Sequence, residues 1–516
     1  MSLNGPADVA VLGAGHNGLI AAAYLARAGL QTLLLEARDT VGGCASTVEA
    51  VGARVNICNC DHVLVRAMPI ADELDLADFG LQYLDVEPVG ISRFWDGHAT
   101  WTAWHDLDTT LDGLRRTYPD EVDGYRRFVR AALPVAELLV ELAQQPPGPG
   151  VLGSVLRRRS TAARRLWRWS RQSAQSLLAD FFGHEALMVP ALATGPVVWG
   201  LDGSTPGTGL GALGYAVRHL VQMGRPVGGS GALTDAVRRS FEAAGGQVRC
   251  GTRVESVLVD GGRRASGGRV AGVRLAGGEV VESAAVVVAC DPGAVALEGS
   301  SLPESFTRRW EPGRKDGYES KLDAVLAEPP IYSEAPDGVG ADEALVPTTF
   351  VLPGLDALAE ALAASADGRV GKRPVFYANV PSVLDHTMRP SGGGEVFSLE
   401  VLYTPYALAG GWPGSGEPAR WLETYGEIVR PGFAETVVDW RAMTPPSYEE
   451  QFSMPRGHAA SFSGSPLSAL LGRPRHLTRY TTPIGGLFCA GAATFPGAGV
   501  WGASGRNVAS VVTRSF

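Results

Sequence analysis

A glycine-rich turn between two apolar strands is the feature that most constrains this chain of 516 residues. Residues 9–12 predict a buried strand, residues 19–28 an Ala-rich helix that Gly29 ends, and residues 32–35 a second strand. Glycines at the spacing Gly-x-Gly-x-x-Gly connect the first strand to the helix. Strand, glycine turn, helix and strand in this order form the βαβ unit that binds dinucleotides. The sequence therefore predicts an α/β fold with a nucleotide site near the N-terminus.

Each residue type in this turn has a physical reason. Gly13 permits the sharp turn out of the strand, Gly15 lets the backbone approach a pyrophosphate, and Gly18 lets helix and strand pack closely. The helix begins beside His16 and Asn17, where free N–H groups and a partial positive charge face the phosphates. We therefore count these five residues among the predicted nucleotide-binding residues.

Glu36 ends the second strand, 18 residues after the last glycine. Its carboxylate can accept the hydroxyl protons of an adenosine ribose, and it would repel a 2′-phosphate, so NADP is disfavoured. The βαβ unit alone leaves NAD and FAD open. An acid-x-Arg-x-x-x-Gly-Gly pattern continues from Glu36, through Ala37, Arg38, Gly42, Gly43 and Cys44. This extension resembles the one in FAD-binding amine oxidases and phytoene desaturases, where the second glycine pair meets the diphosphate and ribityl chain.

A second glycine-rich turn lies near the C-terminus. A short predicted strand, 487–490, leads to Gly491, Gly497, Gly499 and Val500, and then to a final helix. The N-terminus of that helix can face the negative charge that a reduced flavin carries at N1 and O2. The two turns, some 480 residues apart in sequence, are predicted to hold the two ends of one FAD molecule.

These motifs, together with residues 203–211, 226–233 and Lys321–Leu326, resemble the phytoene desaturase-related FAD-dependent oxidoreductases over nearly the whole chain. That family includes carotenoid desaturases and isomerases, amine-oxidase-like flavoproteins and proteins of the pyridine nucleotide-disulfide oxidoreductase domain-containing 2 type. The resemblance implies FAD as cofactor, with the backbone of Val254 near the adenine. Residues 56–62 do not closely match the carotenoid desaturases, which argues against a carotenoid substrate.

The resemblance also implies a Rossmann-like FAD-binding domain of the GR2 type with a discontinuous α+β substrate domain. Breaks in the pattern of strands and helices assign residues 1–66, 225–300 and 479–516 to the FAD-binding domain. Residues 67–224 and 301–478 would together build the substrate-binding domain.

Two residues are predicted to be catalytic. By resemblance to amine oxidases, Lys321 would lie near flavin N5 and act as a base or activate oxygen. The alternative is a surface lysine at a strand edge, paired with Asp323 or Glu319. His62 is a candidate for the substrate site, against a surface or capping role, and Cys58-x-Cys60 beside it leaves covalent flavin attachment as a weaker alternative. Arg506 is expected to bind the diphosphate, pair with Glu36 or lie on a helix surface.

The net charge of −9 and the pI near 5.6 argue against nucleic-acid binding. Six scattered cysteines predict reduced thiols and a cytoplasmic protein, and the nine histidines show no metal-ligand spacing. No signal peptide or membrane span is expected. Seven arginines interleaved with tryptophans between Arg157 and Arg171 leave two alternatives for residues 154–175. They form either a possible peripheral membrane contact or a solvated helix held by salt bridges. The sequence leaves the oligomeric state open.

Three functions are compatible with this pattern. The leading one is an FAD-dependent dehydrogenase, desaturase or oxidase that removes a hydride equivalent from a C–C or C–N bond of an apolar or aromatic small molecule. Because no second nucleotide fingerprint follows, its electrons should pass to oxygen or a quinone. A redox-neutral flavin-dependent isomerase and a non-catalytic flavin-bound scaffold are the alternatives. The candidate aromatic wall residues are Trp95, Trp101, Trp199, Phe350, Tyr403 and Trp412.

Overall fold

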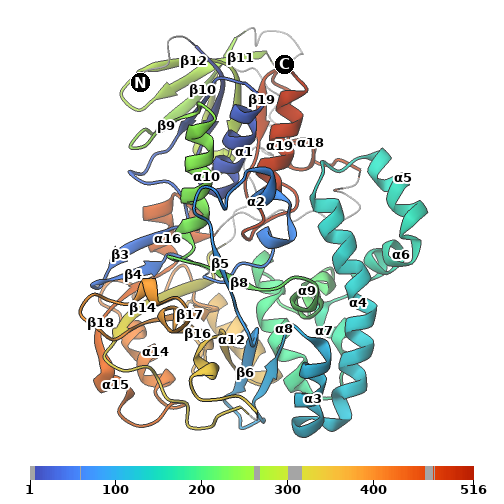
Figure 1. Ribbon diagram of the computed structural model, residues 1–516, viewed down its shortest axis with the longest axis vertical. Helices are drawn as coiled ribbons and strands as arrows, with labels where there is room; N and C mark the ends of the chain where they lie inside the picture. The colour runs from blue at the N-terminus through green and yellow to red at the C-terminus, as the bar shows by residue number, and fades with distance from the viewer. Residues whose placement is uncertain are drawn as a thin grey trace.

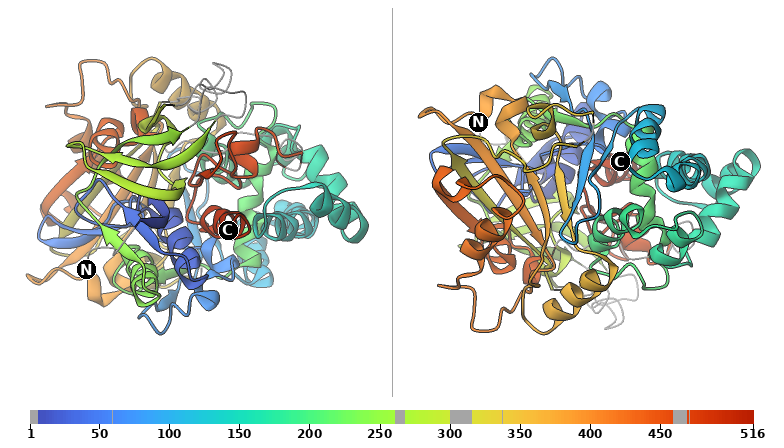
Figure 2. Two further views of the ribbon diagram at one scale, coloured as in Figure 1. Left: turned by 90° about the horizontal axis from the view of Figure 1, so that it is seen from above. Right: turned by 90° about the horizontal axis from the view of Figure 1, so that it is seen from below.

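Two β-sheets and a helical lobe make up the computed structural model of the protein (Figure 1). It describes residues 6–58, 60–260, 268–299, 316–336, 338–458, 469 and 471–516. The sheet that carries the two termini lies at one end of the molecule, and the second sheet and the helical lobe lie side by side at the other (Figures 1 and 2).

The first sheet is formed by short apolar segments from three parts of the chain. Within the described residues it has eight strands, and its central strands run parallel. In spatial order they are β13 (Ala296–Glu298), β10 (Val254–Asp260), β11 (Arg269–Leu275), β12 (Val280–Val288), β1 (Ala7–Leu12), β2 (Thr32–Leu35) and β9 (Gln247–Arg249), with β19 (Leu487–Cys489) beside β12. The strands predicted at 9–12, 32–35 and 487–490 are therefore confirmed.

The two faces of this sheet are covered differently, because side chains alternate along each strand. Val9, Val11 and Leu34 face an apolar cluster with α1 (His16–Arg27), α10 (Gly231–Ala243) and α19 (Ala503–Thr513). Ala10 and Leu12 face the antiparallel strands β10 and β11 instead. The N-terminal and C-terminal helices α1 and α19 thus lie side by side (Figure 1).

The second sheet has seven strands in the described part of the chain. Their order is β18 (Val437–Met443), β14 (Glu319–Leu326), β17 (Glu395–Leu402), β16 (Val375–Asn379), β15 (Thr349–Leu352), β6 (Gly90–Phe94) and β7 (Trp101–Ala103). The pair of β15 and β6 is parallel, and the other pairs are antiparallel. Strands from both predicted insertions therefore pair in one sheet, whereas the exact domain boundaries stay a prediction.

Helices cover both faces of the second sheet. One face meets α14 (Glu417–Tyr425) through a cluster that contains Leu322, Phe376 and Trp421. The other face meets the helical lobe, whose apolar residues form the largest buried cluster. The lobe consists of α3 (Leu107–Thr117), α4 (Val122–Ala143), α5 (Pro149–Arg158), α6 (Ser160–Trp169), α7 (Ala174–Ala179), α8 (Val189–Thr194) and α9 (Gly214–Leu220), and α12 (Leu355–Ala366) packs against it.

Small elements connect these layers. A hairpin of β3 (Thr47–Ala50) and β4 (Ala53–Asn56) and a pair of β5 (Tyr83–Asp85) with β8 (Gly224–Pro226) lie between the sheets. The short helices α2 (Ile70–Glu73), α13 (Pro381–Leu384), α15 (Phe433–Thr436), α16 (Pro445–Phe452) and α18 (Arg475–Thr478) complete the described elements used below. None of the helices in the described ranges combines the length and apolar character needed to cross a bilayer.

The arginine-rich segment does not form one helix. α5 ends at Arg158 and α6 begins at Ser160, since Arg159 between them adopts a non-helical conformation. Arg158 and Arg159 form ion pairs with Glu141 on α4, and Arg159 also pairs with Glu137. Salt bridges therefore hold one side of this segment, as one alternative from the sequence predicted.

Candidate functional site

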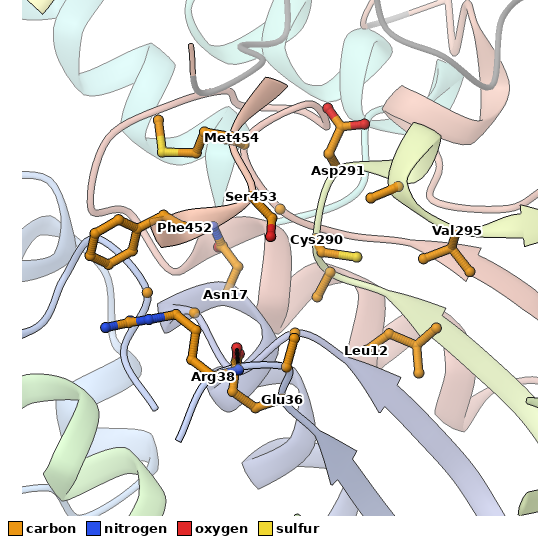
Figure 3. A pocket seen from close by; sticks show the side chains of 18 of the residues that line it. Leu12, Asn17, Glu36, Arg38, Cys290, Asp291, Val295, Phe452, Ser453 and Met454 are labelled. Atoms are coloured by element: carbon orange, nitrogen blue, oxygen red, sulfur yellow. Dashed lines mark hydrogen bonds between the residues drawn. The ribbon is translucent and has the colours of Figure 1, made fainter. Parts of the chain in front are cut away.

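A cavity of about 270 Å³ opens at the carboxyl ends of β1, β2 and β12 (Figure 3). In parallel α/β sheets this edge is where ligands bind. Eleven of the sixteen predicted cofactor-binding residues line the cavity. They are Gly13, Gly15, His16, Asn17, Glu36, Ala37, Arg38, Gly43, Cys44, Val254 and Gly491.

The three glycines of the first turn differ in their surroundings. Gly13 has a φ of +98°, which a side chain would strain. A Cβ on Gly18 would lie 1.9 Å from the carbonyl oxygen of Gly13, so this helix can approach the strand only with glycine there. A Cβ on Gly15 would meet no atom within 4 Å, because it would project into open space. The turn therefore leaves room for a ligand at Gly15 and for nothing at Gly18.

Glu36 and Arg38 are held at one side of the cavity. The Glu36 carboxylate accepts hydrogen bonds from the backbone N–H of Ala14 at 2.7 Å and of Arg38 at 2.9 Å. Figure 3 shows Phe452 beside Arg38, and its ring centroid lies 4.2 Å from the Arg38 guanidinium carbon. Asn17 Oδ1 and one Arg38 Nη are buried without a partner among the described residues. These free polar atoms, the Glu36 carboxylate and the open space at Gly15 fit a dinucleotide such as FAD.

The C-terminal turn meets the first turn at the far side of α1. The His16 ring hydrogen-bonds the backbone of Gly499, and burial lowers the pKa of His16 to about 4. The N–H of Gly491 donates to Ser504 Oγ on α19 at 2.9 Å. The two glycine motifs are thus neighbours, as the prediction of one FAD site requires. Five predicted cofactor residues do not line the cavity itself, namely Gly18, Gly42, Gly497, Gly499 and Val500.

His62 lies between the two sheets. It is only 1% exposed, so the alternative of a surface role is wrong. Its Nδ1 lies 2.9 Å from Tyr83 Oη and its Nε2 lies 2.8 Å from Ser230 Oγ. Burial lowers the pKa of His62 to about 4, so the ring is neutral at pH 7. Its role at the substrate site stays a prediction.

Lys321 lies on β14, a central strand that pairs with both β17 and β18. It is 1% exposed, so the alternative of a surface lysine at a strand edge is wrong. Its Nζ donates to the carbonyl of Asn56 at 2.8 Å and forms a close ion pair with Asp323. Asp323 in turn accepts from Arg441 at 3.1 Å. These contacts hold the Lys321 amino group against the end of β4.

Two glutamates lie beside Lys321; the sequence indicated Glu319 only as a possible ion-pair partner and did not indicate Glu400. Glu319 precedes Lys321 by two residues on β14, and Glu400 is the cross-strand partner of Lys321 on β17. Both side chains are partly exposed, although burial of their carboxyl groups raises the pKa of each to about 8. No sequence pattern indicates Glu400, because only strand register places it next to Lys321.

The cavity also has lining residues that the sequence did not indicate. Cys290 and Asp291 follow β12, so the rule that ligands bind at the carboxyl ends of parallel strands could have identified them. Phe452, Ser453 and Met454 come from the C-terminal end of α16 and belong to the other half of the molecule (Figure 3). No sequence pattern marks this second group.

The aromatic candidates are divided by the second sheet. Phe350 and Tyr403 lie on the face that carries Lys321, and Phe350 contacts Tyr377 at a ring distance of 4.8 Å. Trp95 and Trp412 pack in the cluster on the opposite face, so they are wrong as wall residues. Trp101 lies in the core of the helical lobe, and the side chain of Trp199 lies outside the described part of the structure.

Arg506 does not pair with Glu36. Its guanidinium binds the Glu73 carboxylate at 2.6 and 2.7 Å and donates to the carbonyl of Gln144. It therefore connects α19 to α2 and to the end of α4. All six cysteines are free thiols, as predicted.

Comparison with known proteins agrees with this geometry. Residues 18–314 match the flavin containing amine oxidoreductase family. The rat (Rattus norvegicus) pyridine nucleotide-disulfide oxidoreductase domain-containing protein 2 is 29% identical, over 99% of this chain and 94% of its own. A neurosporene-forming phytoene desaturase from Cereibacter sphaeroides is 25% identical, over 96% and 92%.

Solved structures share the fold. Cyclohexylamine oxidase from Brevibacterium oxydans superposes with a TM-score of 0.59 at 14% identity, covering 99% of each chain. The sequence-based predictions of the family, the Rossmann-like fold with an α/β architecture, and FAD as cofactor are thereby confirmed. The chain belongs to the flavin-containing amine oxidoreductase family and is an FAD-dependent oxidoreductase.

Proposed function

We propose that the protein is a dehydrogenase, desaturase or oxidase that removes a hydride equivalent from a C–C or C–N bond of an apolar or aromatic small molecule. The observation that carries this proposal is the face of the second sheet between Lys321 and the helical lobe. On this face the aromatic side chains lie on the same side of the sheet as Lys321 and Glu400; they are Phe350, Tyr377 and Tyr403. Aromatic rings would hold the apolar part of a substrate, and the polar row would hold its reacting end.

FAD, when bound, supplies the two-electron acceptor. The chain's own residues position it: the open backbone at Gly15 and the N-terminus of α1 would hold the diphosphate, and Glu36 the adenosine ribose. In this proposal the positive charge of Lys321 and the neutral ring of His62 border the reacting end from opposite directions. Lys321 bonds to Asn56 O, and the Asn56 side chain bonds to Ser230, the partner of His62.

The division of the chain follows from the same proposal. Residues 1–66, 225–300 and 479–516 would bind FAD, and residues 67–224 and 301–478 would enclose the substrate. The phytoene desaturase relative supports an apolar substrate with a C–C bond to oxidise, and the family name supports a C–N bond. Oxygen or a quinone is the proposed electron acceptor.

Anaerobic bleaching of the bound flavin tests the proposal. The holoprotein is mixed with amines, amino acids and polyenes, and the flavin absorbance near 450 nm is followed. We expect one class to bleach the flavin, and air or a soluble quinone to restore its colour. Turnover that needs a pre-reduced flavin and leaves the substrate's oxidation state unchanged would instead identify an isomerase. A folded holoprotein that no compound bleaches would contradict the proposal.

A further inference from the structure

Glu400 lies in the middle of a row of polar side chains on the substrate-facing side of the second sheet. Its Cα pairs with that of Lys321 on β14 and with that of Tyr377 on β16. Cross-strand partners place their side chains on the same face, a few ångströms apart. Glu319 and Asp323 flank Lys321 on that face, because residues two apart on a strand point the same way.

The members of this row have different partners. Asp323 is engaged by both Lys321 and Arg441. The carboxyl groups of Glu319 and Glu400, in contrast, form no hydrogen bond and no ion pair with any residue that the structure describes. A buried carboxyl group without such partners holds its proton more tightly, and this desolvation is the largest cause of the pKa of about 8 at each site.

Lys321, unlike these glutamates, is already engaged by its neighbours. Its ammonium group already donates to the Asn56 carbonyl and to Asp323, so removing its proton would break an ion pair in the interior. The amide nitrogen of Asn56, buried and without a partner in the described residues, marks a second unused polar group beside the row. A buried polar atom without a protein partner commonly marks the place of a bound ligand, water or ion.

We propose that Glu400, supported by Glu319, accepts the proton that the substrate loses when its hydride goes to FAD. The hydride carries both electrons of its C–H bond to the flavin. The proton on the neighbouring carbon or nitrogen goes to the Glu400 carboxylate, and the electron pair left behind forms the new double bond. This inference rests on the proposed oxidation, and Lys321 stays bonded to Asp323 and to the Asn56 carbonyl.

The titration of Glu400 depends on groups from every element around it. Ionised Glu319, Asp61 and Asp323 raise its pKa, and Lys321 lowers it. The other titratable groups that interact with it are Tyr318 before β14, Tyr377 on β16, Cys58 and Cys60 after β4, and Tyr448 on α16. Because desolvation is the largest cause, we expect the carboxyl group to titrate near pH 8.

Sulfite provides a test that needs no substrate, because it adds reversibly to oxidised flavin and bleaches it. Sulfite is titrated into the holoprotein at pH 7 and pH 9 for the wild type, Glu400→Gln and the control Glu423→Gln. Glu423 is exposed on α14, at the opposite face of the sheet. Ionised Glu400 would repel the anion, so the wild type and the control should lose roughly tenfold more affinity between these pH values than Glu400→Gln. An identical pH dependence in all three proteins would overturn the proposal.

The second measurement uses whichever compound bleaches the flavin in the anaerobic screen. In the wild type and Glu423→Gln the bleaching rate should rise with pH to a plateau above about 8. Glu400→Gln should be about 100-fold slower or more, without that pH dependence. Glu400→Asp keeps a carboxyl group and should regain part of the rate. If no compound bleaches the flavin, the proposed function fails while the sulfite titration still tests Glu400. A Glu400→Gln protein with the rate and pH profile of the wild type would refute its role.

A separate observation concerns the outer side of the helical lobe. α5 and α6 lie at the edge of the molecule, away from both sheets, in every view (Figures 1 and 2). The arginines that do not pair with α4 there are Arg157, Arg164, Arg168 and Arg171, and all four are exposed. No acidic side chain in the described chain pairs with them. Trp167 among them is 45% exposed, and we call these five residues the basic face.

We infer that the basic face binds the surface of an anionic phospholipid membrane. The protein as a whole carries a net charge of −9, yet four arginines without acidic partners lie together on α5, on α6 and just after α6. This local positive charge is complementary to an anionic membrane surface. An exposed indole between arginines suits the boundary between headgroups and acyl chains.

Vesicle co-sedimentation tests this inference. The holoprotein should bind vesicles of phosphatidylcholine with 30% phosphatidylglycerol and not pure phosphatidylcholine, and high salt should release it. Arg164→Gln and Arg168→Gln should each weaken binding about fivefold. Arg430→Gln removes an exposed arginine elsewhere and should change nothing. Binding that persists in Arg164→Gln/Arg168→Gln/Trp167→Ala, or no binding to either vesicle, would refute the inference.

Discussion

Substitutions at Gly15 and Gly18 should separate the cofactor-binding and structural roles of the first turn. Both glycines change to alanine, so the added group is the same methyl. At Gly18 that methyl would lie 1.9 Å from the carbonyl oxygen of Gly13, where real contacts are at least 3.0 Å. The start of α1 would therefore have to move by about 1.1 Å away from the turn at Gly13. Both α1 and the strand β1 before this turn belong to the buried core.

This displacement sets the expected magnitude. Overpacking of a core costs about 1–3 kcal/mol, and rigid backbone on both sides places Gly18→Ala at the upper end. The higher helix propensity of alanine offsets about 0.5–1 kcal/mol. We therefore expect a loss of about 2 kcal/mol and, for a chain of this length, a fall of about 2 °C in the melting temperature of the apoprotein. Gly15→Ala, with a φ of −65° and open space at its Cβ, should cost under about 1 kcal/mol.

FAD binding should show the reverse order. The methyl of Gly15→Ala would occupy the space where the backbone approaches the diphosphate, and we expect affinity to fall by about 10–100-fold. Calorimetric melting of the apoproteins and quenching of FAD fluorescence measure the two effects. If Gly15→Ala destabilised the apoprotein as much as Gly18→Ala, or bound FAD as tightly as the wild type, this assignment of the two glycines would be wrong.

Three further results are expected from buried and exposed charges and thiols. Asp323→Asn leaves Lys321 buried without its carboxylate and should lower the stability of the apoprotein by about 3–5 kcal/mol in calorimetric melting, unlike Asp439→Asn. The pKa of Glu319 and of Glu400 is raised to about 8, so above about pH 4.5 the folded state binds more protons than the unfolded state. The contribution of these two groups to the free energy of unfolding should therefore fall as the pH rises from 4.5 to 8. Glu400→Gln should make this fall smaller. Cys250 is the one exposed cysteine of the described chain, so maleimide should label it first, and mass spectrometry after brief treatment of Cys250→Ser should find little label.

The cofactor half of the molecule could be predicted because its signals are local. The glycines of the first turn, the strand ahead of them and the helix behind them are adjacent in sequence, and their spacing follows from contact with one ligand. Helix α1 nonetheless starts at His16, three residues before the predicted start, since the glycine turn itself begins the helix.

The arginine-rich segment shows where a periodic pattern misleads. Arginines and tryptophans recur at helical spacing through residues 154–175, yet Arg159 breaks the helix. Two of its neighbours, Glu137 and Glu141, lie on α4, so ion pairs formed across the lobe decide the local conformation. Periodicity along one segment cannot reveal a partner that lies on another.

The substrate half could not be predicted for a related reason. Glu400 lies 79 residues after Lys321 in sequence and becomes its neighbour only through the register of β14 with β17. Lys321 could be predicted as a site residue because the segment Lys321–Leu326 resembles the family, whereas the segment around Glu400 shows no such resemblance. The sequence does not distinguish a glutamate with a buried carboxyl group from the common case, in which a glutamate on a strand faces solvent.

The arrangement as a whole explains why the chain would place acid groups beside a buried lysine. Removing a hydride leaves a proton that must go to a group ready to receive it at neutral pH, and an exposed glutamate, ionised far below pH 7, is a weak acceptor. Desolvation between the sheet and the helical lobe raises the proton affinity of Glu400, while the fixed charge of Lys321 limits that rise. Asp323 pairs with the lysine and holds it in place, and Arg441 pairs with the other oxygen of Asp323. In this proposal the role of base, which the sequence assigned to Lys321, passes to the glutamates, and the lysine lies beside them bonded to Asp323.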